Sequence, residues 1–387
     1  MMRTQVGIIG AGPAGLLLAH LLHLAGVDSV VIEARSRGYI EGRVRAGLLE
    51  QGSVDTLAEA GLAARLRREG LSHDGLELRF DGMSHRIDLH GLTGRRVTIY
   101  GQQEVVKDMV AARLETGRPL YFEVEDTAVH DVATAHPRIT WTQEGTRQEL
   151  HCDVVAGCDG FHGVSRGAIP AEVLRVYERI YPFAWLGILA QARPISHELI
   201  YARHSDGFAL ATMRSQTISR LYLQCAPEED LSAWSDTRIW DALQTRLGAV
   251  NEGQILQKGV TGMRSFVAEP MRHGRLFLAG DAAHIVPPTG AKGMNLAIAD
   301  VRVLARALTA FFRGEGEALM DRYSETCLSR IWKVQRFSSW MTAMLHRFDD
   351  NDPFEHRVQL AELDYVVHSQ AARTALAEQY VGLPYES

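Results

Sequence analysis

The 387-residue sequence predicts a mixed α/β protein, in which a parallel βαβ unit is combined with an antiparallel sheet and a helical C-terminal region. Three observations support this prediction. The N-terminus has a glycine-rich strand–helix–strand pattern, the middle of the chain alternates apolar and polar residues, and the last third contains long amphipathic stretches. The length leaves room for two domains that share an interface.

The N-terminal pattern is typical of a dinucleotide-binding unit. An apolar run at 6–9 fits a buried strand, a leucine-rich helical stretch follows, and a second strand at 29–32 ends in Glu33. A carboxylate at the end of this second strand can accept hydrogen bonds from a ribose hydroxyl.

Three glycines between the first strand and the helix have the spacing G-x-G-x-x-G. In such a unit Gly10 permits the tight turn, Gly12 lets a pyrophosphate approach the backbone, and Gly15 lets helix and strand pack closely. The helix N-terminus adds unpaired N–H groups and a partial positive charge. Because strand, glycines, helix and acid occur in order, nucleotide binding is favoured over a chance glycine turn.

Composition excludes several classes of protein. The net charge is −6 and the arginines are scattered, which argues against a nucleic-acid partner. The apolar fraction of 46% and charged fraction of 23% are ordinary for a globular protein, and no apolar run reaches the length of a membrane span. We expect no targeting peptide, because glycines, a proline and histidines interrupt the first apolar run. The four cysteines lack metal-type spacing and fit a reducing cytoplasm.

Beyond the first unit, the periodicity predicts a series of further elements. They are a helix at 51–68, strands at 76–80 and 86–89, a helix at 102–114, and strands at 122–129 and 138–141.

Residues 183–225 then alternate in the manner of half-buried strands. If the hairpin loop centres on Thr217, Thr212 lies directly opposite Tyr222, and both share a sheet face with Arg214. The strand positions on this face contain no acidic residue. An arginine there is costly unless an anion binds it, although an arginine whose head reaches solvent explains the pattern equally well.

Two more strands end in turns that contain an acid. The strand at 151–160 ends near Asp159, and a later one ends at Asp281. A proline- and glycine-containing turn at 287–293 then leads into a helix expected at 294–312, whose N-terminus directs a positive dipole toward that turn.

The three strand-to-turn segments, distributed along the whole chain, resemble the flavoprotein monooxygenases of the aromatic hydroxylase type. The motifs that carry the resemblance are RVRAG at 43–47, GCDGFHG at 157–163, IYA at 200–202, VPPTGAKG at 286–293 and YVGLPY at 380–385. The resemblance extends from residue 5 to residue 385. It implies a Rossmann-like FAD-binding domain (1–73, 98–180 and 263–345), an interleaved substrate-binding sheet domain (74–97 and 181–262) and a C-terminal helical region (346–387) at the active site and the subunit interface.

The resemblance also implies an activity. The expected reaction converts 4-hydroxybenzoate to 3,4-dihydroxybenzoate through a flavin C4a-hydroperoxide, with FAD, O2 and either NADPH or NADH, in the catabolism of aromatic compounds. A cytoplasmic homodimer without a membrane or nucleic-acid partner is expected. Three alternatives remain: a sibling hydroxylase for another phenolic acid, a dehydrogenase with one dinucleotide site, and a non-catalytic FAD-binding protein.

The resemblance assigns the substrate's carboxylate to the alternating sheet. Arg214 matches the arginine that pairs with this carboxylate, and Tyr222 matches a phenol that bonds to it. Thr212 stands where the family usually has serine, and it keeps the hydroxyl.

For the phenolic end of the substrate, the resemblance implies that Tyr201 bonds to the phenolic oxygen, with Tyr385 as its relay partner and His73 at the solvent end. The Pro288 carbonyl faces the substrate's hydroxyl group. A phenol of pKa ~10 is only about one part in a thousand ionised at pH 7, so holding it as a phenolate requires roughly 4 kcal/mol. One hydrogen bond to a charged group contributes roughly 1.5–3 kcal/mol, which makes a relay useful. Histidine suits its outer end because it titrates near neutrality.

The cofactor residues follow from the turns and the resemblance. For FAD they are Gly10, Gly12, Gly15, Glu33, Arg43, Arg45, Gln102, Asp159, Asp281, Lys292, Gly293, Met294 and Asn295, the last near the flavin ring. For the reduced nicotinamide cofactor they are Arg35, Tyr39, Phe161, His162, Arg166 and Arg264. Members that prefer NADPH tend to have a basic residue after the strand-end acid, where this chain has Ala34, so the choice between NADPH and NADH stays open.

Overall fold

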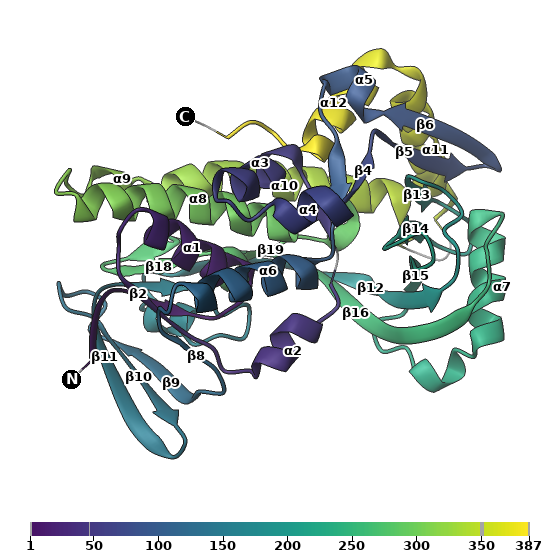
Figure 1. The fold of residues 1–387 in the computed structure, drawn as a ribbon. Helices are drawn as coiled ribbons and strands as arrows, with labels where there is room; N and C mark the ends of the chain where they lie inside the picture. Colours follow the sequence, from purple (N-terminus) through teal and green to yellow (C-terminus); the bar gives the residue numbers. More distant parts are fainter. Residues whose placement is uncertain (1, 46, 349–351, 386–387) are drawn as a thin grey trace.

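The computed structural model describes residues 2–45, 47–348 and 352–385. Ala46 of the RVRAG motif lies outside these residues. The described chain forms two large sheets, one small sheet, and helices that cover them, with α8 and α10 lying side by side along the molecule (Figure 1). None of the helices in the described ranges is long and apolar enough to cross a membrane.

The helices are α1 (Pro13–Leu24), α2 (Arg37–Gly42), α3 (Gln51–Glu59), α4 (Ala64–Glu69), α5 (Leu89–Thr93), α6 (Gln102–Glu115), α7 (Asp236–Leu247), α8 (Gly293–Phe312), α9 (Ala318–Asp321), α10 (Tyr323–Leu345), α11 (Pro353–His368) and α12 (Gln370–Val381). Short 3₁₀ turns are η1 (Ser165–Ala168), η2 (Leu231–Ala233), η3 (Gly280–Ala282) and η4 (Pro288–Gly290).

The first sheet contains the N-terminal unit. Its strand order is β17 (Arg272–His273), β18 (Leu276–Leu278), β11 (Thr146–Gly157), β1 (Met2–Ile9), β2 (Ser29–Ile32) and β8 (Leu120–Tyr121), with β10 (Arg138–Gln143) and β9 (Glu125–His130) continuing from β11. Strands β1, β2, β8, β11 and β18 pair in parallel, and α1 packs against α6 and α8. The carboxyl ends of these parallel strands therefore lie along one edge of the sheet, where the glycine turn and the two acid-containing turns meet.

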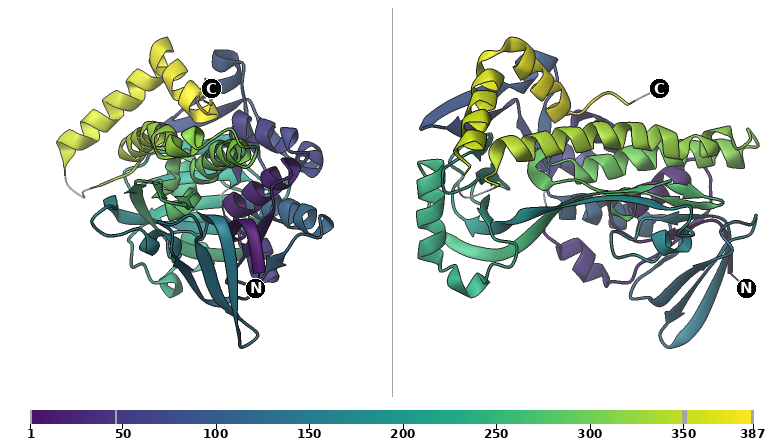
Figure 2. Two further views of the ribbon diagram at one scale, coloured as in Figure 1. Left: turned by 90° about the vertical axis from the view of Figure 1, so that its left-hand side faces the viewer. Right: turned by 180° about the vertical axis from the view of Figure 1, so that it is seen from behind.

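The second sheet contains the alternating segment. Its order is β19 (His284–Ile285), β16 (Gln254–Glu269), β12 (Arg175–Gln191), β15 (Ser219–Cys225), β14 (Ala209–Met213), β13 (Leu199–Ala202), β5 (Gly75–Phe80) and β6 (Met83–Asp88). One face packs on α10 and α12, and the other packs on α7. The small third sheet is β3 (Leu48–Leu49), β7 (Val97–Ile99) and β4 (Leu71–His73). Figure 2 shows α11 and α12 beside this second sheet, next to one end of α10.

The predicted register of the β14–β15 hairpin is wrong by two residues. Met213 pairs with Ser219, so the loop centres on residue 216, Thr212 lies opposite Arg220, and Tyr222 lies opposite Leu210. Because side chains alternate with a period of two, a shift of two residues changes partners but keeps every side chain on its predicted face.

The helix predicted at 51–68 is two helices. Helix α3 ends at Glu59, Gly61 adopts φ +75°, and α4 begins at Ala64. A left-handed glycine ends a helix readily, and the apolar spacing on either side concealed the break. The strand predicted from 122 begins at Glu125, and the helix predicted from 294 begins at Gly293.

Candidate active site

The glycine turn after β1 has the shape that a dinucleotide requires. Gly10 has φ +101°, and a Cβ there would lie 2.3 Å from the Cys158 carbonyl oxygen. A Cβ on Gly15 would lie 1.9 Å from the Gly10 carbonyl oxygen, whereas one on Gly12 would meet nothing within 4 Å. No side chain caps the N-terminus of α1, and no acid lies in its first turn. The open space beside Gly12 and the uncapped amides fit the pyrophosphate of FAD.

Alanine at these two positions is expected to act differently. Gly15→Ala forces helix and strand apart, so it lowers the free energy of unfolding of the apoprotein by about 2 kcal/mol or more. Gly12→Ala leaves apoprotein stability unchanged but weakens FAD binding by about tenfold or more, because its methyl group occupies the space of a phosphate. Chemical denaturation of the apoproteins and FAD titration separate the two effects. Equal FAD affinity in Gly12→Ala and wild type would contradict this assignment of the turn.

At the end of β2, Glu33 accepts hydrogen bonds from the backbone amides of Ala11 (2.7 Å) and Arg35 (2.8 Å). The carboxylate thus links the glycine turn to the chain that follows β2. It lies at the end of β2, where a carboxylate is predicted to bind a ribose hydroxyl of the dinucleotide.

The acid-containing turns lie at the same edge. Asp159 accepts hydrogen bonds at 2.9 Å from the amide and hydroxyl of Ser165, and its Oδ1 is buried without a partner in the described chain. Burial raises the pKa of Asp159. At the third turn, burial and the nearby Arg43 lower the pKa of Arg45, while the negative charge of Asp281 opposes this shift.

The start of α8 lies next to the third turn. Gly293 and Met294 form its first turn, which contains no acid and no side-chain cap. The Asn295 amide donates to the carbonyls of Leu48 (3.0 Å) and Ala291 (2.9 Å). Gln102 begins α6.

The residues predicted for the nicotinamide cofactor gather around one aromatic ring. The guanidinium groups of Arg166 and Arg264 lie 5.0 and 4.5 Å from the centre of the Phe161 ring, and the His162 ring meets that ring edge-on at 4.9 Å. Two more predicted residues lie on or near α2, where Arg35 is 5.5 Å from the Tyr39 ring.

The predicted substrate residues share one face of the second sheet. Tyr201 pairs with Leu210, which pairs with Tyr222, so the two phenols flank one sheet position. Thr212 is buried in the next row. The four residues Tyr201, Thr212, Arg214 and Tyr222 are therefore brought to one side of the sheet by strand alternation.

Arg214 has no acidic partner within the described ranges. Its guanidinium reaches only the carbonyls of Met213 and Arg45, both at a long 3.4 Å, and its buried Nε has no hydrogen-bond partner there. Burial and the neighbouring Arg220 lower the pKa of Arg214. A partly buried guanidinium with unused donors can bind a carboxylate.

The relay partner predicted for Tyr201 is wrong. The Tyr201 hydroxyl donates to the Thr289 carbonyl (2.9 Å) and lies 2.7 Å from the hydroxyl of Tyr380, not that of Tyr385. Tyr380 is in the last turn of α12, facing the core, whereas Tyr385 lies beyond the helix. Both tyrosines belong to the YVGLPY motif, and the helix decides which of them reaches Tyr201. Burial raises the pKa of both Tyr201 and Tyr380.

The predicted position of His73 at the solvent end of the relay is wrong, whereas the Pro288 carbonyl can still accept a hydrogen bond. His73 is 1% exposed, so it does not lie at a solvent end, and burial lowers its pKa to about 4 rather than leaving it near neutrality. Neither of its nitrogens has a hydrogen-bond partner in the described chain. The Pro288 carbonyl accepts the Ala291 amide (2.9 Å), which leaves one lone pair for a second donor.

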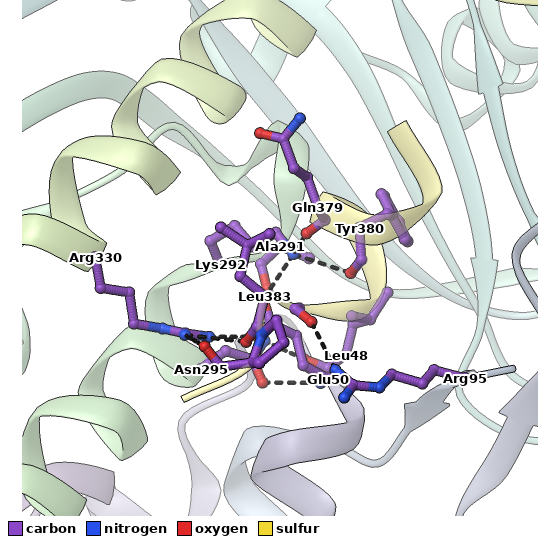
Figure 3. A network of polar contacts seen from close by, with 12 residues as sticks. Leu48, Glu50, Arg95, Ala291, Lys292, Asn295, Arg330, Gln379, Tyr380 and Leu383 are labelled. Atoms are coloured by element: carbon purple, nitrogen blue, oxygen red, sulfur yellow. Dashed lines mark hydrogen bonds and ion pairs between the residues drawn. The ribbon is translucent and has the colours of Figure 1, made fainter. Parts of the chain in front are cut away.

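Lys292 was predicted to bind FAD, but its ammonium group is fully hydrogen-bonded within the protein. Its Nζ donates to the Glu50 carboxylate (2.6 Å) and to the carbonyls of Gln379 (2.6 Å) and Tyr380 (2.9 Å), as Figure 3 shows. An ammonium group has three donors, so none remains for the cofactor. Neither Glu50 nor Tyr380 was predicted as a site residue; their only signals in the sequence are an acid after the RVRAG motif and a second tyrosine in the YVGLPY motif.

The neutral side chain of His346 contacts Trp185, which packs beside Tyr222 on the predicted substrate face of the second sheet. His346 Nε2 accepts the indole N–H of Trp185 (2.7 Å), and Nδ1 donates to the Thr342 carbonyl (3.0 Å). Trp185 in turn lies 4.9 Å from the Tyr222 ring. Burial lowers the pKa of His346 to about 3.

The low pKa of His346 predicts acid sensitivity. Between its unfolded pKa of 6.5 and its folded value of about 3, the unfolded chain binds the proton and the folded chain does not, so stability is present above pH 6.5 and is lost as the pH falls. The upper limit is roughly 5 kcal/mol at about 1.36 kcal/mol per pKa unit. Denaturant unfolding at pH 7 and pH 4.5 measures this loss. It should be smaller in His346→Gln, whose amide still accepts the Trp185 N–H, and an equal loss in both proteins would refute the idea.

The fold and the three turns define an FAD-binding α/β protein, and the chain belongs to the family whose model is described as "FAD binding domain", which matches residues 3–338. FAD is therefore its cofactor. The chain is 49% identical to the p-hydroxybenzoate hydroxylase of Acinetobacter baylyi, with 100% of this chain and 96% of that protein covered.

More distant relatives show the same family. A 3-(3-hydroxy-phenyl)propionate/3-hydroxycinnamic acid hydroxylase of Mycobacterium sp. is 26% identical over 83% of this chain and 56% of its own length. The crystal structure of p-nitrophenol 4-monooxygenase PnpA from Pseudomonas putida superposes with a TM-score of 0.83 at 19% identity, covering 99% of this chain and 100% of that one, which establishes the fold. The predicted fold class is confirmed.

Proposed function

We propose that the protein hydroxylates 4-hydroxybenzoate next to its phenolic carbon, giving 3,4-dihydroxybenzoate. The observation that carries the proposal is that one sheet face presents both the partly buried Arg214, which has no acidic partner in the described chain and whose Nε is buried without a partner, and the Tyr201–Tyr380 hydroxyl pair. A carboxylate held by the first and a phenol held by the second match the two ends of this substrate. The full-length 49% identity to a p-hydroxybenzoate hydroxylase supports the same reading.

In this proposal Arg214 binds the substrate carboxylate through two parallel N–H donors, and the hydroxyls of Tyr222 and Thr212 donate further hydrogen bonds to the same carboxylate. The interaction replaces the two weak 3.4 Å contacts that Arg214 makes with backbone carbonyls. Fixing the carboxylate fixes the position of the ring, because benzoate is rigid.

At the other end, Tyr201 releases the Thr289 carbonyl and donates to the phenolic oxygen of the substrate, while Tyr380 donates to Tyr201. Two linked hydroxyls stabilise a phenolate better than one, since a chain of hydrogen bonds polarises cooperatively. Before ionisation, the second lone pair of the Pro288 carbonyl accepts a hydrogen bond from the phenolic O–H of the substrate, and on ionisation the proton leaves through the hydroxyls of Tyr201 and Tyr380. FAD, bound at the three turns, would take two electrons from NAD(P)H and activate O2, so that one oxygen atom is transferred to the substrate and the other leaves as water.

His73 serves this relay in its neutral form. With a pKa of about 4 it stays uncharged at pH 7, so one ring nitrogen can accept a hydrogen bond while the other donates one. This differs from a histidine that stores the proton, and it predicts no rate change as the pH crosses 6.5.

The nicotinamide cofactor is proposed to bind at the Phe161 ring, between Arg166 and Arg264, with Arg35 and Tyr39 near its ribose. Arg37 is paired with Glu41 (2.7 Å), so Arg35 is the better candidate for a 2′-phosphate. We further propose a cytoplasmic homodimer, in keeping with four free, buried cysteines. Residues 74–97 and 181–262 form the proposed substrate-binding unit.

The first experiment is aerobic turnover of the purified FAD protein with 4-hydroxybenzoate, with NADPH and NADH offered separately and the aromatic product identified. The proposal expects 3,4-dihydroxybenzoate, and the two rates give the nucleotide preference. Oxidation of the nucleotide with peroxide as the only product would assign the substrate to a sibling phenolic acid. No oxidation at all would favour a non-catalytic FAD-binding protein.

A further inference from the structure

The chain after α12 is held by cations from separate parts of the molecule. Arg330 on α10 donates to the carbonyls of Leu383 (3.0 Å) and Pro384 (3.1 Å), and Arg95 lies 3.3 Å from the Gly382 carbonyl. Figure 3 shows these guanidinium groups reaching the chain end from opposite sides. Carbonyls beyond a helix C-terminus are good partners for cations.

Glu50 joins this arrangement to Lys292. Its carboxylate receives Lys292 Nζ at 2.6 Å and Arg330 at 3.5 Å. Gly382 has φ +98°, and a Cβ there would lie 2.2 Å from Glu50 Oε2, so the backbone turns directly against the carboxylate. The turn after α12 is thus fixed at a defined position relative to α3 and α8.

The ring of Tyr385, which follows this turn, contacts two arginine side chains. Its ring centre lies 5.2 Å from the Arg302 guanidinium and 4.8 Å from that of Arg330, so two cations contact one aromatic ring. A Cβ on Gly52 would lie 2.9 Å from the ring, which therefore packs directly on α3. The Tyr385 hydroxyl is buried close to the side-chain hydroxyls of Ser53 and Thr56, but it makes no hydrogen bond of good geometry in the described chain. The best-defined contacts of Tyr385 are therefore those of its ring with the two cations and with α3.

We propose that Tyr385, Arg302 and Arg330 form a C-terminal latch that positions Tyr380 against Tyr201. The inference deepens the proposed function, because it rests on Tyr201 and Tyr380 acting together on the substrate's phenol. Tyr380 lies in the last turn of α12, and the latch fixes the segment that leaves this turn. When the ring contact is lost, the last turn of α12 opens more often and the hydroxyl pair is broken for part of the time.

The test compares Tyr385→Ala, Tyr385→Phe and the matched control Tyr365→Ala, whose side chain is exposed on α11. All are studied as full-length FAD proteins. Hydrogen exchange of the amides in 376–385 reports the latch, and the absorbance of bound 4-hydroxybenzoate against pH reports the pKa of the bound phenol. Arg302→Gln, which removes one of the two cations, keeps the test valid if Tyr385→Ala folds poorly.

In Tyr385→Ala, exchange at 376–385 is expected to rise by about tenfold, as the loss of two partly buried cation–π contacts implies. The bound phenol's pKa should rise by about one unit, the value of one hydrogen bond. Tyr385→Phe and Tyr365→Ala should match wild type in both measurements, and Arg302→Gln should shift both in the same direction as Tyr385→Ala.

Three results would overturn the latch: unchanged exchange in Tyr385→Ala, faster exchange without a change in the phenol's pKa, or a Tyr385→Phe protein as impaired as Tyr385→Ala. The last would mean that the Tyr385 hydroxyl acts directly. If wild type itself never ionises the bound phenol, the proposed function fails, whereas the exchange comparison still tests whether Tyr385 holds the chain end.

Discussion

Replacing Arg214 by lysine is expected to weaken 4-hydroxybenzoate binding almost as much as replacing it by alanine. Lysine keeps the charge, but an ammonium group cannot form the two parallel hydrogen bonds of a guanidinium. For alanine we expect a loss of about a hundredfold or more in affinity, as when one partner of a buried charged pair is truncated. Substrate titration followed by flavin absorbance measures both variants.

The matched control is Arg147→Lys, because Arg147 is exposed on β11 in the first sheet. It should bind substrate like wild type. Near-normal affinity in Arg214→Lys would show that Arg214 is not the carboxylate anchor, and the proposed orientation of the substrate would then have to be reversed or abandoned.

Tyr201→Phe and Tyr380→Phe are each expected to lower the hydroxylation rate by about a hundredfold, the range of a lost proton-transfer group. Flavin binding, and flavin reduction by the nicotinamide cofactor, should survive in both, so more of the reducing equivalents end as peroxide. The ratio of aromatic product to nucleotide oxidised measures the effect.

Tyr323→Phe serves as the control, since it removes a buried hydroxyl that donates to the Leu278 carbonyl (2.8 Å), distant in sequence from the relay. Its stability should fall while its product ratio stays normal. Fully coupled hydroxylation in both Tyr201→Phe and Tyr380→Phe would remove the hydroxyl pair from the mechanism.

The local features of the fold were predictable because they depend on local chemistry. The glycine turn follows from sterics at Gly10 and Gly15, and strand β2 was predicted at its observed bounds. Helix α7 was missed even though Ser235 caps its start and a left-handed Gly248 ends it. Those are ordinary helix signals, and the preceding strand pattern obscured them.

The site was predictable where strand alternation decides it and not where packing decides it. A register shifted by two residues from the predicted one still places Arg214 and Tyr222 on the same sheet face, so the wrong pairing did not change the predicted set of site residues. The choice between Tyr380 and Tyr385 depends on where α12 ends, and the pKa of His73 depends on its burial. Neither can be read from spacing along the chain.

The parallel pairing of β1 with β11 and of β11 with β18 has a consequence for how the protein is maintained in a cell. Val6 pairs with Val154, and Val155 pairs with Leu276, so these contacts close very long loops and form late in folding. FAD bound at the turns that end these strands, as proposed, would require the folded chain, so it would raise the stability by mass action. The supply of flavin would then affect the amount of folded protein as well as its activity.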